Sequence, residues 1–448
     1  MLSYKAIGKK RINYSVFNIY NSKDINSQLD SNESYSHYMN NIIFILILSF
    51  VLSNPSMLHA LFEKSKTIPY TEFTKIVYPE RVNNNIYIGT NSINRPIDFN
   101  KTSSIVLSKG KIISNILSSD NKLYYLDSQG YVYAYDFRQK KVLWKTSATT
   151  SIGKEHFDGG ISKCCKKLYV TNGTMDLIVI DINNGDIINM TQSAHTIISK
   201  PVVYKKNLFV KMADGSVSSY DKNSLKKIWT QYDTNIALVS QKNLDPFVYN
   251  DVLVNMYNSG NIVSYDIENG KVHSQYQKKV SELNKKLSGE YKIAEVKSFS
   301  DYIFDKSTLY TCSDTGDFLK ISLSNKNLNV KRKRDDIQHV HSMSKLGNTV
   351  YFLNNARQLI AMTENLEVIW TNEMNVEERI NHKKRVVYFK PLLINNQIIV
   401  IDNLGNINVV NPITGSIIDN HKVKSGINSY QVHDNRLYLI YDKHIVVV

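Results

Sequence analysis

The sequence predicts an all-β fold, an eight-bladed β-propeller built from four-stranded antiparallel blades. Three observations support this prediction. A glycine position recurs along the chain at intervals of 40 to 56 residues, two alternating runs rich in aromatic and β-branched residues flank it, and all three tryptophans occupy one position of the repeat. Repeats of about this length that contain several strands each are typical of propeller blades.

The repeat is clearest in residues 122–144 and 207–229. In both, the glycine stands six residues before an aspartate and fourteen residues before a tryptophan. The seven equivalent positions are Gly130, Met175, Gly215, Gly260, Gly316, Ala356 and Gly405, where Met175 fits if its hairpin holds two extra residues. We interpret the three recurring residue types as structural, because glycine supplies a positive φ angle, aspartate binds turn amides and tryptophan fills the gap between blades.

Each repeat supplies four strands. An alternating run such as 122–126 is followed by a short polar turn and a second run such as 131–135, which is the pattern of a β-hairpin. A second turn, often with a glycine, leads to a third run that ends at the tryptophan position. A fourth short run precedes each hairpin, as in 112–117. Four antiparallel strands of this kind make one blade.

The two ends of the repeat region predict how the ring closes. Seven complete units run from about residue 112 to residue 420, and an eighth begins at 426–430 and ends the chain at 444–448, one strand short. An incomplete ring would leave unpaired strand edges. We therefore expect the missing strand to come from the N-terminal side of the domain, either Asn85–Ile88 or Ser104–Leu107.

The N-terminal part divides by composition. Residues 1–41 are polar and are expected to be disordered or an extension upstream of the true start, since either Met1 or Met39 could be the initiator. Residues 42–60 begin with the run IIFILILSFVL, which is short for a membrane span and suits a signal peptide or an anchor. Residues 61–110 are expected to be a linker with the ring-closing strand, and residues 111–448 the propeller.

Charge and cysteine content exclude several classes. The net charge is +15, but the only dense basic run, Lys331–Arg334, is followed at once by Asp335 and Asp336, so we expect no nucleic-acid partner. Three cysteines in 448 residues exclude a disulfide scaffold and a multi-cysteine zinc module.

The repeat resembles the pyrroloquinoline-quinone-type propeller repeat, in the form YxxxxdGxxxAxDxxxGxxxW. Within that superfamily the chain is most similar to the BamB-type scaffold lipoprotein of the outer-membrane β-barrel assembly machinery, over roughly residues 60–448. The resemblance implies a non-enzymatic periplasmic scaffold, peripheral to the outer membrane, whose partners are the barrel-forming subunit and unfolded outer-membrane proteins. The family's lipidated cysteine is absent here, since the corresponding residues are Val51–Asn54. We therefore expect any membrane attachment to come from the apolar segment or from the partner.

The resemblance also indicates where the partner would bind. Family members contact the barrel-forming subunit through two neighbouring inter-blade loops, and the repeat phase transfers these to residues 191–198 and 239–245 of this chain. The candidate partner-binding residues are Ser193, Ala194, His195, Thr196, Ile197, Ile198, Asn243, Leu244 and Asp245. The apolar members would supply exposed contacts and Asp245 an acidic anchor, or else the apolar members would only brace the loops from beneath the rim.

Two rival functions share this fold, a quinone-dependent dehydrogenase and a generic periplasmic interaction propeller. Some quinoprotein dehydrogenases carry a vicinal disulfide, so the pair Cys164–Cys165 is notable, although two free thiols on the inner strand of the second blade are the simpler interpretation. His339 and His341 share a strand face without a third ligand nearby. We expect no catalytic residues, no cofactor and no metal. The insertion 274–296 has helical spacing of its apolar residues and could form a short helix.

Overall fold

The computed structural model describes residues 92–93, 97–99, 102–106, 110–113, 115–150, 159–233, 244–277, 299–313, 318–334, 340–354, 356–374, 386–433 and 435–448. The chain divides into two compact units, Met1–Tyr78 and Pro79–Val448, and every described residue belongs to the second. The predicted segments 1–41 and 42–60 lie outside the described residues. The described part contains strands and turns but no helix, and so none that could cross a membrane.

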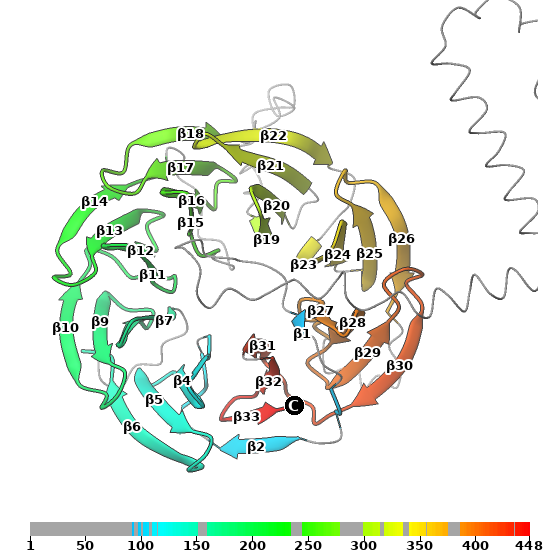
Figure 1. Ribbon diagram of the computed structural model, residues 1–448, viewed down its shortest axis with the longest axis horizontal. Coiled ribbons are helices and arrows are strands. Elements are labelled where there is room, and N and C mark those ends of the chain that lie inside the picture. The colour runs from blue at the N-terminus through cyan, green and yellow to red at the C-terminus, as the bar shows by residue number, and fades with distance from the viewer. Residues whose placement is uncertain are drawn as a thin grey trace, which may run out of the picture. The chain divides into compact units, whose positions relative to one another are not determined.

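Eight antiparallel sheets surround a common axis in the second unit (Figure 1). The first four blades are β3–β6 (Leu117–Ser119, Lys122–Leu126, Tyr131–Asp136, Lys141–Ser147), β7–β10 (Gly160–Cys164, Lys167–Thr171, Asp176–Asp181, Ile187–Gln192), β11–β14 (Val202–Tyr204, Asn207–Lys211, Val217–Asp221, Lys227–Gln231) and β15–β18 (Phe247–Tyr249, Val252–Met256, Ile262–Asp266, Val272–Tyr276). The next three are β19–β22 (Phe299–Asp305, Thr308–Ser313, Phe318–Ser324, Asn327–Arg334), β23–β26 (Val340–Leu346, Thr349–Asn354, Gln358–Thr363, Val368–Glu373) and β27–β30 (Leu392–Ile394, Gln397–Ile401, Asn406–Val410, Ile417–Lys422). The predicted eight-bladed propeller is confirmed.

The last blade is closed from the N-terminal side, as expected. It consists of β31 (Ser429–His433), β32 (Arg436–Ile440), β33 (His444–Val447) and β2 (Ser103–Val106), in the order β2-β33-β32-β31. The strand β2 runs antiparallel to β33, with Ser103 opposite Val447 and Val106 opposite His444. The second of the two predicted candidates therefore closes the ring, and the first, residues 85–88, lies outside the described residues.

Three details differ from the sequence-based expectation. A two-residue strand, β1 (Ser92–Ile93), adds a parallel fifth strand to the inner edge of the seventh blade. The inner strand of the first blade is Leu117–Ser119 rather than 112–117, because Ile112 forms only an isolated bridge to Asp127. The start of the predicted helical insertion, residues 274–276, belongs to the strand β18, and residues 278–298 lie outside the described part.

The recurring aspartates bind turn amides, as interpreted from the sequence. The carboxylate of Asp136 accepts hydrogen bonds from the backbone N–H groups of Arg138 and Gln139, at 2.7 and 2.8 Å. Asp221 accepts from Asn223 and Ser224 in the same way, at 3.0 and 2.8 Å. These N–H donors hold the pKa of both carboxyl groups below its usual range.

Each of the three recurring tryptophans joins its own blade to the next one. The ring of Trp229 in the third blade lies against Gly270 in the last turn of the fourth, and its Nε1 donates to the carbonyl of Ile267 at 3.1 Å. The pairs Trp144–Gly185 and Trp370–Gly415 repeat this arrangement. A Cβ atom on Gly270 would stand 2.7 Å from the Trp229 ring, and its φ of +74° disfavours other residues as well. Glycine is thus required at this turn by both space and backbone conformation.

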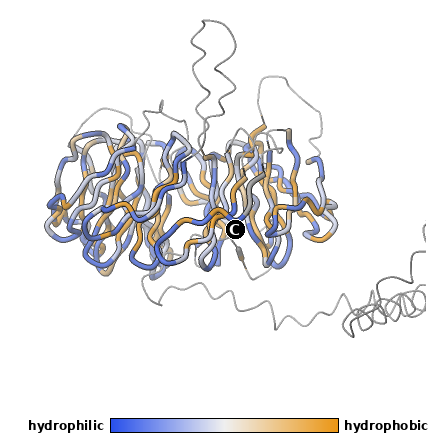
Figure 2. Tube along the Cα trace, turned by 90° about the horizontal axis from the view of Figure 1, so that it is seen from above, coloured by the Kyte–Doolittle hydropathy of each residue, from blue (hydrophilic) through white to orange (hydrophobic). Residues whose placement is uncertain are grey.

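Apolar side chains fill the seams between neighbouring blades. Clusters of buried residues from neighbouring blades form these seams, and Figure 2 shows the ring edge-on, with hydrophobic and hydrophilic stretches interleaved along the Cα trace. The seam between the last and first blades has the same character, since Ile105, Tyr438 and Ile445 pack in one buried cluster with Leu123 and Tyr125. Ring closure therefore buries a full apolar layer in addition to pairing one strand edge.

A charge inside this closing seam should open the ring. We predict that Ile105→Asp lowers the free energy of unfolding by more than about 3 kcal/mol, because the buried side chain would carry an unpaired carboxylate. The matched control is Ser104→Asp, whose side chain is exposed on the same strand and should have little effect. Urea unfolding measures both, and equal stability of the two variants would contradict closure by β2.

The tryptophan–glycine contact gives a second test. Gly270→Ala should destabilise the protein by about 2 to 3 kcal/mol, from the positive φ angle together with the clash against Trp229. The control Gly215→Ala has a similar φ of +83° and no atom within 4 Å of the added methyl group, so only the backbone cost of about 1 kcal/mol remains. Denaturation of both variants would show a larger loss for Gly270→Ala, and the reverse order would refute the packing role.

Candidate functional site

The first predicted partner loop joins β10 to β11 and has an exposed tip. Ala194 and His195 are exposed, and Thr196 is half-buried. His195 Nε2 lies 3.3 Å from Asp214 Oδ2 in the turn between β12 and β13. Ser193 is buried, and its hydroxyl donates to the carbonyl of Met175 at 3.1 Å. The loop thus has a fixed base and a polar tip that faces solvent.

The apolar members of the predicted site are buried, which agrees with the second of the two alternatives that the sequence left open, namely that they brace the loops from beneath the rim. Ile197, Ile198 and Leu244 are 0%, 9% and 9% exposed. Ile197 bridges to Met212 and packs in the seam between the second and third blades. Leu244 packs with Phe247 in the seam between the fourth and fifth. Ile197 stands five residues before β11 and Leu244 three residues before β15, where the chain approaches the inner strand and its apolar side chains fill the seam.

The structure brings the two predicted loops together through Asp245. Its Oδ1 accepts from the backbone N–H of Lys200 at 3.1 Å, and its Oδ2 lies 3.5 Å from Lys200 Nζ. Its carbonyl accepts from the hydroxyl of Tyr302 at 3.0 Å. Asp245 keeps 30% of its side chain exposed, so it both fixes the loop base and reaches solvent. Asn243 lies outside the described residues.

A ring of polar contacts links all eight inner strands and the residues that lead into them. Each contact joins one blade to a neighbour close to the axis. In order around the ring they are Asn115 Nδ2 to Ile161 O (2.9 Å), Ser162 Oγ to Pro201 O, Lys200 N to Asp245 Oδ1 (3.1 Å), Tyr302 Oη to Asp245 O (3.0 Å), Met343 N to Asp301 Oδ2 (2.8 Å), Ser344 Oγ to Pro391 O, Tyr430 Oη to Lys390 O (2.6 Å) and Ile116 N to Gln431 Oε1 (2.8 Å). The polar groups around the axis therefore serve the ring itself.

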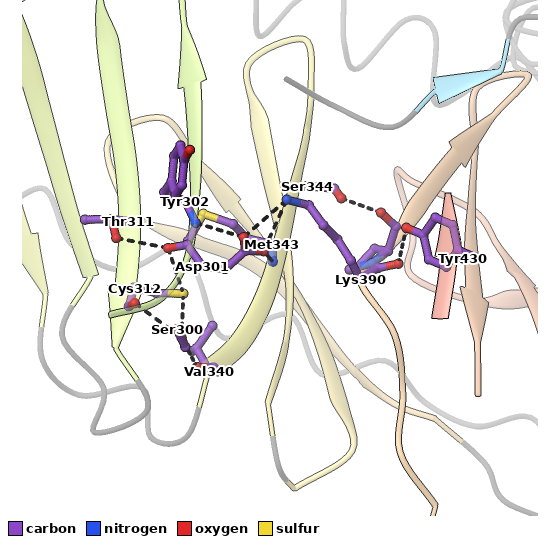
Figure 3. A network of polar contacts seen from close by, with 11 residues as sticks. Ser300, Asp301, Tyr302, Thr311, Cys312, Val340, Met343, Ser344, Lys390 and Tyr430 are labelled. Atoms are coloured by element: carbon purple, nitrogen blue, oxygen red, sulfur yellow. Dashed lines mark hydrogen bonds and ion pairs between the residues drawn. The ribbon is translucent and has the colours of Figure 1, made fainter. Parts of the chain in front are cut away.

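Asp301 is the most connected member of this inner polar ring (Figure 3). It follows a bulge in β19, and its carboxylate accepts from the backbone N–H groups of Tyr302 and Met343, at 2.9 and 2.8 Å. The ammonium of Lys390 reaches it from the seventh blade at 3.2 Å. One carboxylate thus joins the fifth, sixth and seventh blades, and the backbone of Lys390 in turn accepts from Tyr430 of the eighth.

The most deeply buried lysine among the described residues was not predicted from the sequence. Lys211 at the end of β12 is 1% exposed, and its Nζ donates to the carbonyl of Met256 in the fourth blade at 2.8 Å. Burial lowers the pKa of this ammonium to about 8. The only signal in the sequence was a lysine at the end of a largely apolar strand. The alternation of polar and apolar residues does not distinguish such a lysine from one that faces solvent.

The adjacent cysteines lie at the first turn of the second blade. Cys164 ends β7, Cys165 occupies the turn with a φ of +60°, and their Sγ atoms are 3.4 Å apart as free thiols. Burial raises the pKa of the Cys164 thiol. The inner-strand position predicted for the pair is thus confirmed for Cys164. The side chains of His339 and His341 lie outside the described part, and elsewhere in it no three His, Cys, Asp or Glu side chains gather as metal ligands.

Known proteins resemble this chain in both sequence and fold. An uncharacterized protein of Rickettsia prowazekii, RP232, is 25% identical over 382 residues, which cover 82% of this chain and 90% of that protein. The crystal structure of BamB from Moraxella catarrhalis superposes with a TM-score of 0.64 at 16% identity, covering 77% of this chain and 98% of that one. Quinohemoprotein alcohol dehydrogenase from Comamonas testosteroni shares the fold with a TM-score of 0.55 at 10% identity, covering 78% of this chain and 76% of that one.

The sequence model of one family matches residues 128–372, which is more than half of the chain, and the family is described as outer membrane protein assembly factor BamB. The matched region runs from the first blade into the sixth and contains two of the tryptophan–glycine contacts and the tryptophan of the third. The protein therefore belongs to the BamB family of pyrroloquinoline-quinone-type propeller repeat proteins.

Proposed function

We propose that the protein is a non-enzymatic scaffold of outer-membrane β-barrel protein assembly, which binds the barrel-forming subunit and unfolded barrel proteins. The observation that carries this proposal is the family match over residues 128–372 on a complete eight-bladed ring. In this proposal the protein acts in the periplasm, peripheral to the membrane. Residues 42–60 serve as signal peptide or anchor, after an N-terminal extension of residues 1–41, and residues 61–110 link them to the propeller and close it.

The two ends of the ring differ in a way that suits protein binding at one of them. Connections of 12, 9, 15 and 22 residues follow β6, β10, β14 and β18, and all lead from an outer strand back to the next inner strand. In an antiparallel blade these connections lie at the end of the ring where the inner strands begin. We call this end the loop face. Long loops on a rigid scaffold commonly carry binding residues, which favours this face for the partner.

The exposed tip of the first loop is the proposed contact. Ala194 and His195 protrude from a base that Ser193, Lys200 and Asp245 fix through hydrogen bonds, so the loop offers a preformed surface. Preorganisation of this kind lowers the entropic cost of binding. Because Ile197, Ile198 and Leu244 are buried, the surface that remains for the partner is polar.

The inner polar ring supports the scaffold over the dehydrogenase. Asp301, Lys390, Tyr430 and Gln431 bond to neighbouring blades, so each of these side chains already has a structural role near the axis. A catalytic site requires polar groups that converge on a substrate instead. The dehydrogenase remains the second candidate because a protein of that class shares the fold.

Charge at the loop tip should abolish partner capture. We predict that the double variant Ala194→Glu, His195→Glu reduces recovery of the barrel-forming subunit at least tenfold, in an affinity capture from solubilised envelope that detects this subunit specifically. The melting temperature should change by no more than about 2 °C, because both side chains are exposed.

The matched control carries the same charges on the same face across the ring. Lys424→Glu with Ser425→Glu changes two exposed residues of the loop between β30 and β31. Full capture by this control is expected. Undiminished capture by the loop-tip variant, or an equal loss in the control, would remove the proposed contact.

The enzyme alternative has its own test. We predict that the purified full chain shows no saturable binding of pyrroloquinoline quinone with calcium in calorimetry, and no dye-linked oxidation of primary alcohols after incubation with both. A quinoprotein dehydrogenase assayed in parallel validates the measurement. Stoichiometric quinone binding together with alcohol oxidation would overturn the scaffold assignment.

A further inference from the structure

The end of the ring opposite the loop face is strongly basic over three adjacent blades. It is formed by the turns 119–122, 136–141, 163–167, 181–186, 204–207 and 221–227, which we call the basic turn face. These turns of the first three blades contain twelve lysine and arginine residues and only five aspartates. Among the described residues, the corresponding turns of the other five blades contain five cations and six carboxylates. The positive charge is therefore concentrated on one sector of one face.

Direct contacts show that these turns form one continuous surface. Lys163 of the second blade bonds to Ser119 and lies 3.5 Å from Asp120 of the first. Lys167 Nζ reaches Asn223 Oδ1 of the third blade at 3.4 Å. The turns between first and second strands and between third and fourth strands lie at the same end of an antiparallel blade, so their charges face the same way.

Most of the positive charge on this face is not neutralised. Twelve cations against five aspartates leave these turns with a net charge of +7. Lys140, Lys166 and Lys226 are exposed, and none of the ion pairs recorded between described residues involves them. Lys205 and Lys206 do pair, with Asp251 and Glu268, at the border with the fourth blade.

We propose that the basic turn face docks onto a membrane surface of anionic phospholipid headgroups. Eleven of its twelve cations are lysines, with Arg138 the exception. A lysine ammonium is a compact point charge that suits diffuse attraction to many phosphates, whereas bidentate recognition of one carboxylate or phosphate favours arginine. The chemistry therefore fits a charged surface better than a single acidic epitope.

The shape of the face also suits a planar surface. Its first turns contain only two residues each, 120–121, 165–166 and 205–206, and four or five residues form its outer turns. The long connections all emerge at the opposite end. Docking would set the ring axis perpendicular to the bilayer surface and turn the loop face toward the periplasm. This inference rests on the proposed function for its compartment, and it assigns that scaffold a second, lipid-binding side.

Vesicle flotation of the full chain tests the proposal without any protein partner. The probe is a vesicle of phosphatidylcholine with about 30% phosphatidylglycerol, and the control is a vesicle of pure phosphatidylcholine. Any binding through the apolar segment 42–52 occurs with both kinds of vesicle, so the difference between them reports the attraction to anionic headgroups. We expect at least tenfold more protein on the anionic vesicles, and loss of this difference when salt rises from about 0.05 to about 0.5 M. The variant Lys140→Glu, Lys166→Glu, Lys226→Glu should lose the difference.

The matched control makes the same change of charge on the same end of the ring. Lys271→Glu, Lys306→Glu and Lys326→Glu alter three exposed lysines of the fourth and fifth blades, and this variant should bind within twofold of the unaltered chain. Equal binding by the first variant, or equal loss in both, would overturn the proposal. Capture of the barrel-forming subunit by the first variant should be unchanged, so failure of this inference is distinguishable from failure of the scaffold function.

Discussion

The pairing of β2 with β33 is the contact on which the rest of the structure depends. Residues more than 300 positions apart in sequence meet in this ladder, and the seam beside it buries Ile105 among side chains of the first and last blades. In seven blades the four antiparallel strands follow one another in sequence, whereas the four strands of the eighth blade come together only when the two ends of the domain meet. The entropy cost of closing the loop between β2 and β33 grows only slowly with the length of that loop. Closure leaves no unpaired blade at either end of the ring.

Closure also completes the inner polar ring. The link from Ile116 to Gln431 joins the first blade to the last, and without it the chain of contacts around the axis would be interrupted. Buried polar groups are costly when partly satisfied and confer a unique arrangement when fully satisfied. The inner polar ring therefore ties each blade to the next one near the axis.

The sequence was sufficient for the parts of the fold that repeat. The phase of Gly130 and Trp144, and of their equivalents, predicted eight blades and a closing strand from the N-terminal side with two candidates for it, because each repeat must satisfy the same turn and seam. Features that occur once could not be found this way. The parallel strand β1, the buried Lys211 and the carboxylate of Asp301 depend on neighbours in other blades. The sequence left open whether Ile197 and Leu244 are exposed or brace their loops from beneath, because this depends on the neighbouring blade, and the structure places both in seams between blades.

The proposed function gives the two ends of the ring different partners, protein at the loop face and lipid at the basic turn face. Site-specific photocrosslinking in native membranes tests this division most directly, with one photoreactive residue at position 194 and another at position 166. The account predicts an adduct with the barrel-forming subunit from position 194 and lipid adducts from position 166. Protein adducts without any lipid adduct from position 166, or lipid adducts from position 194, would contradict it.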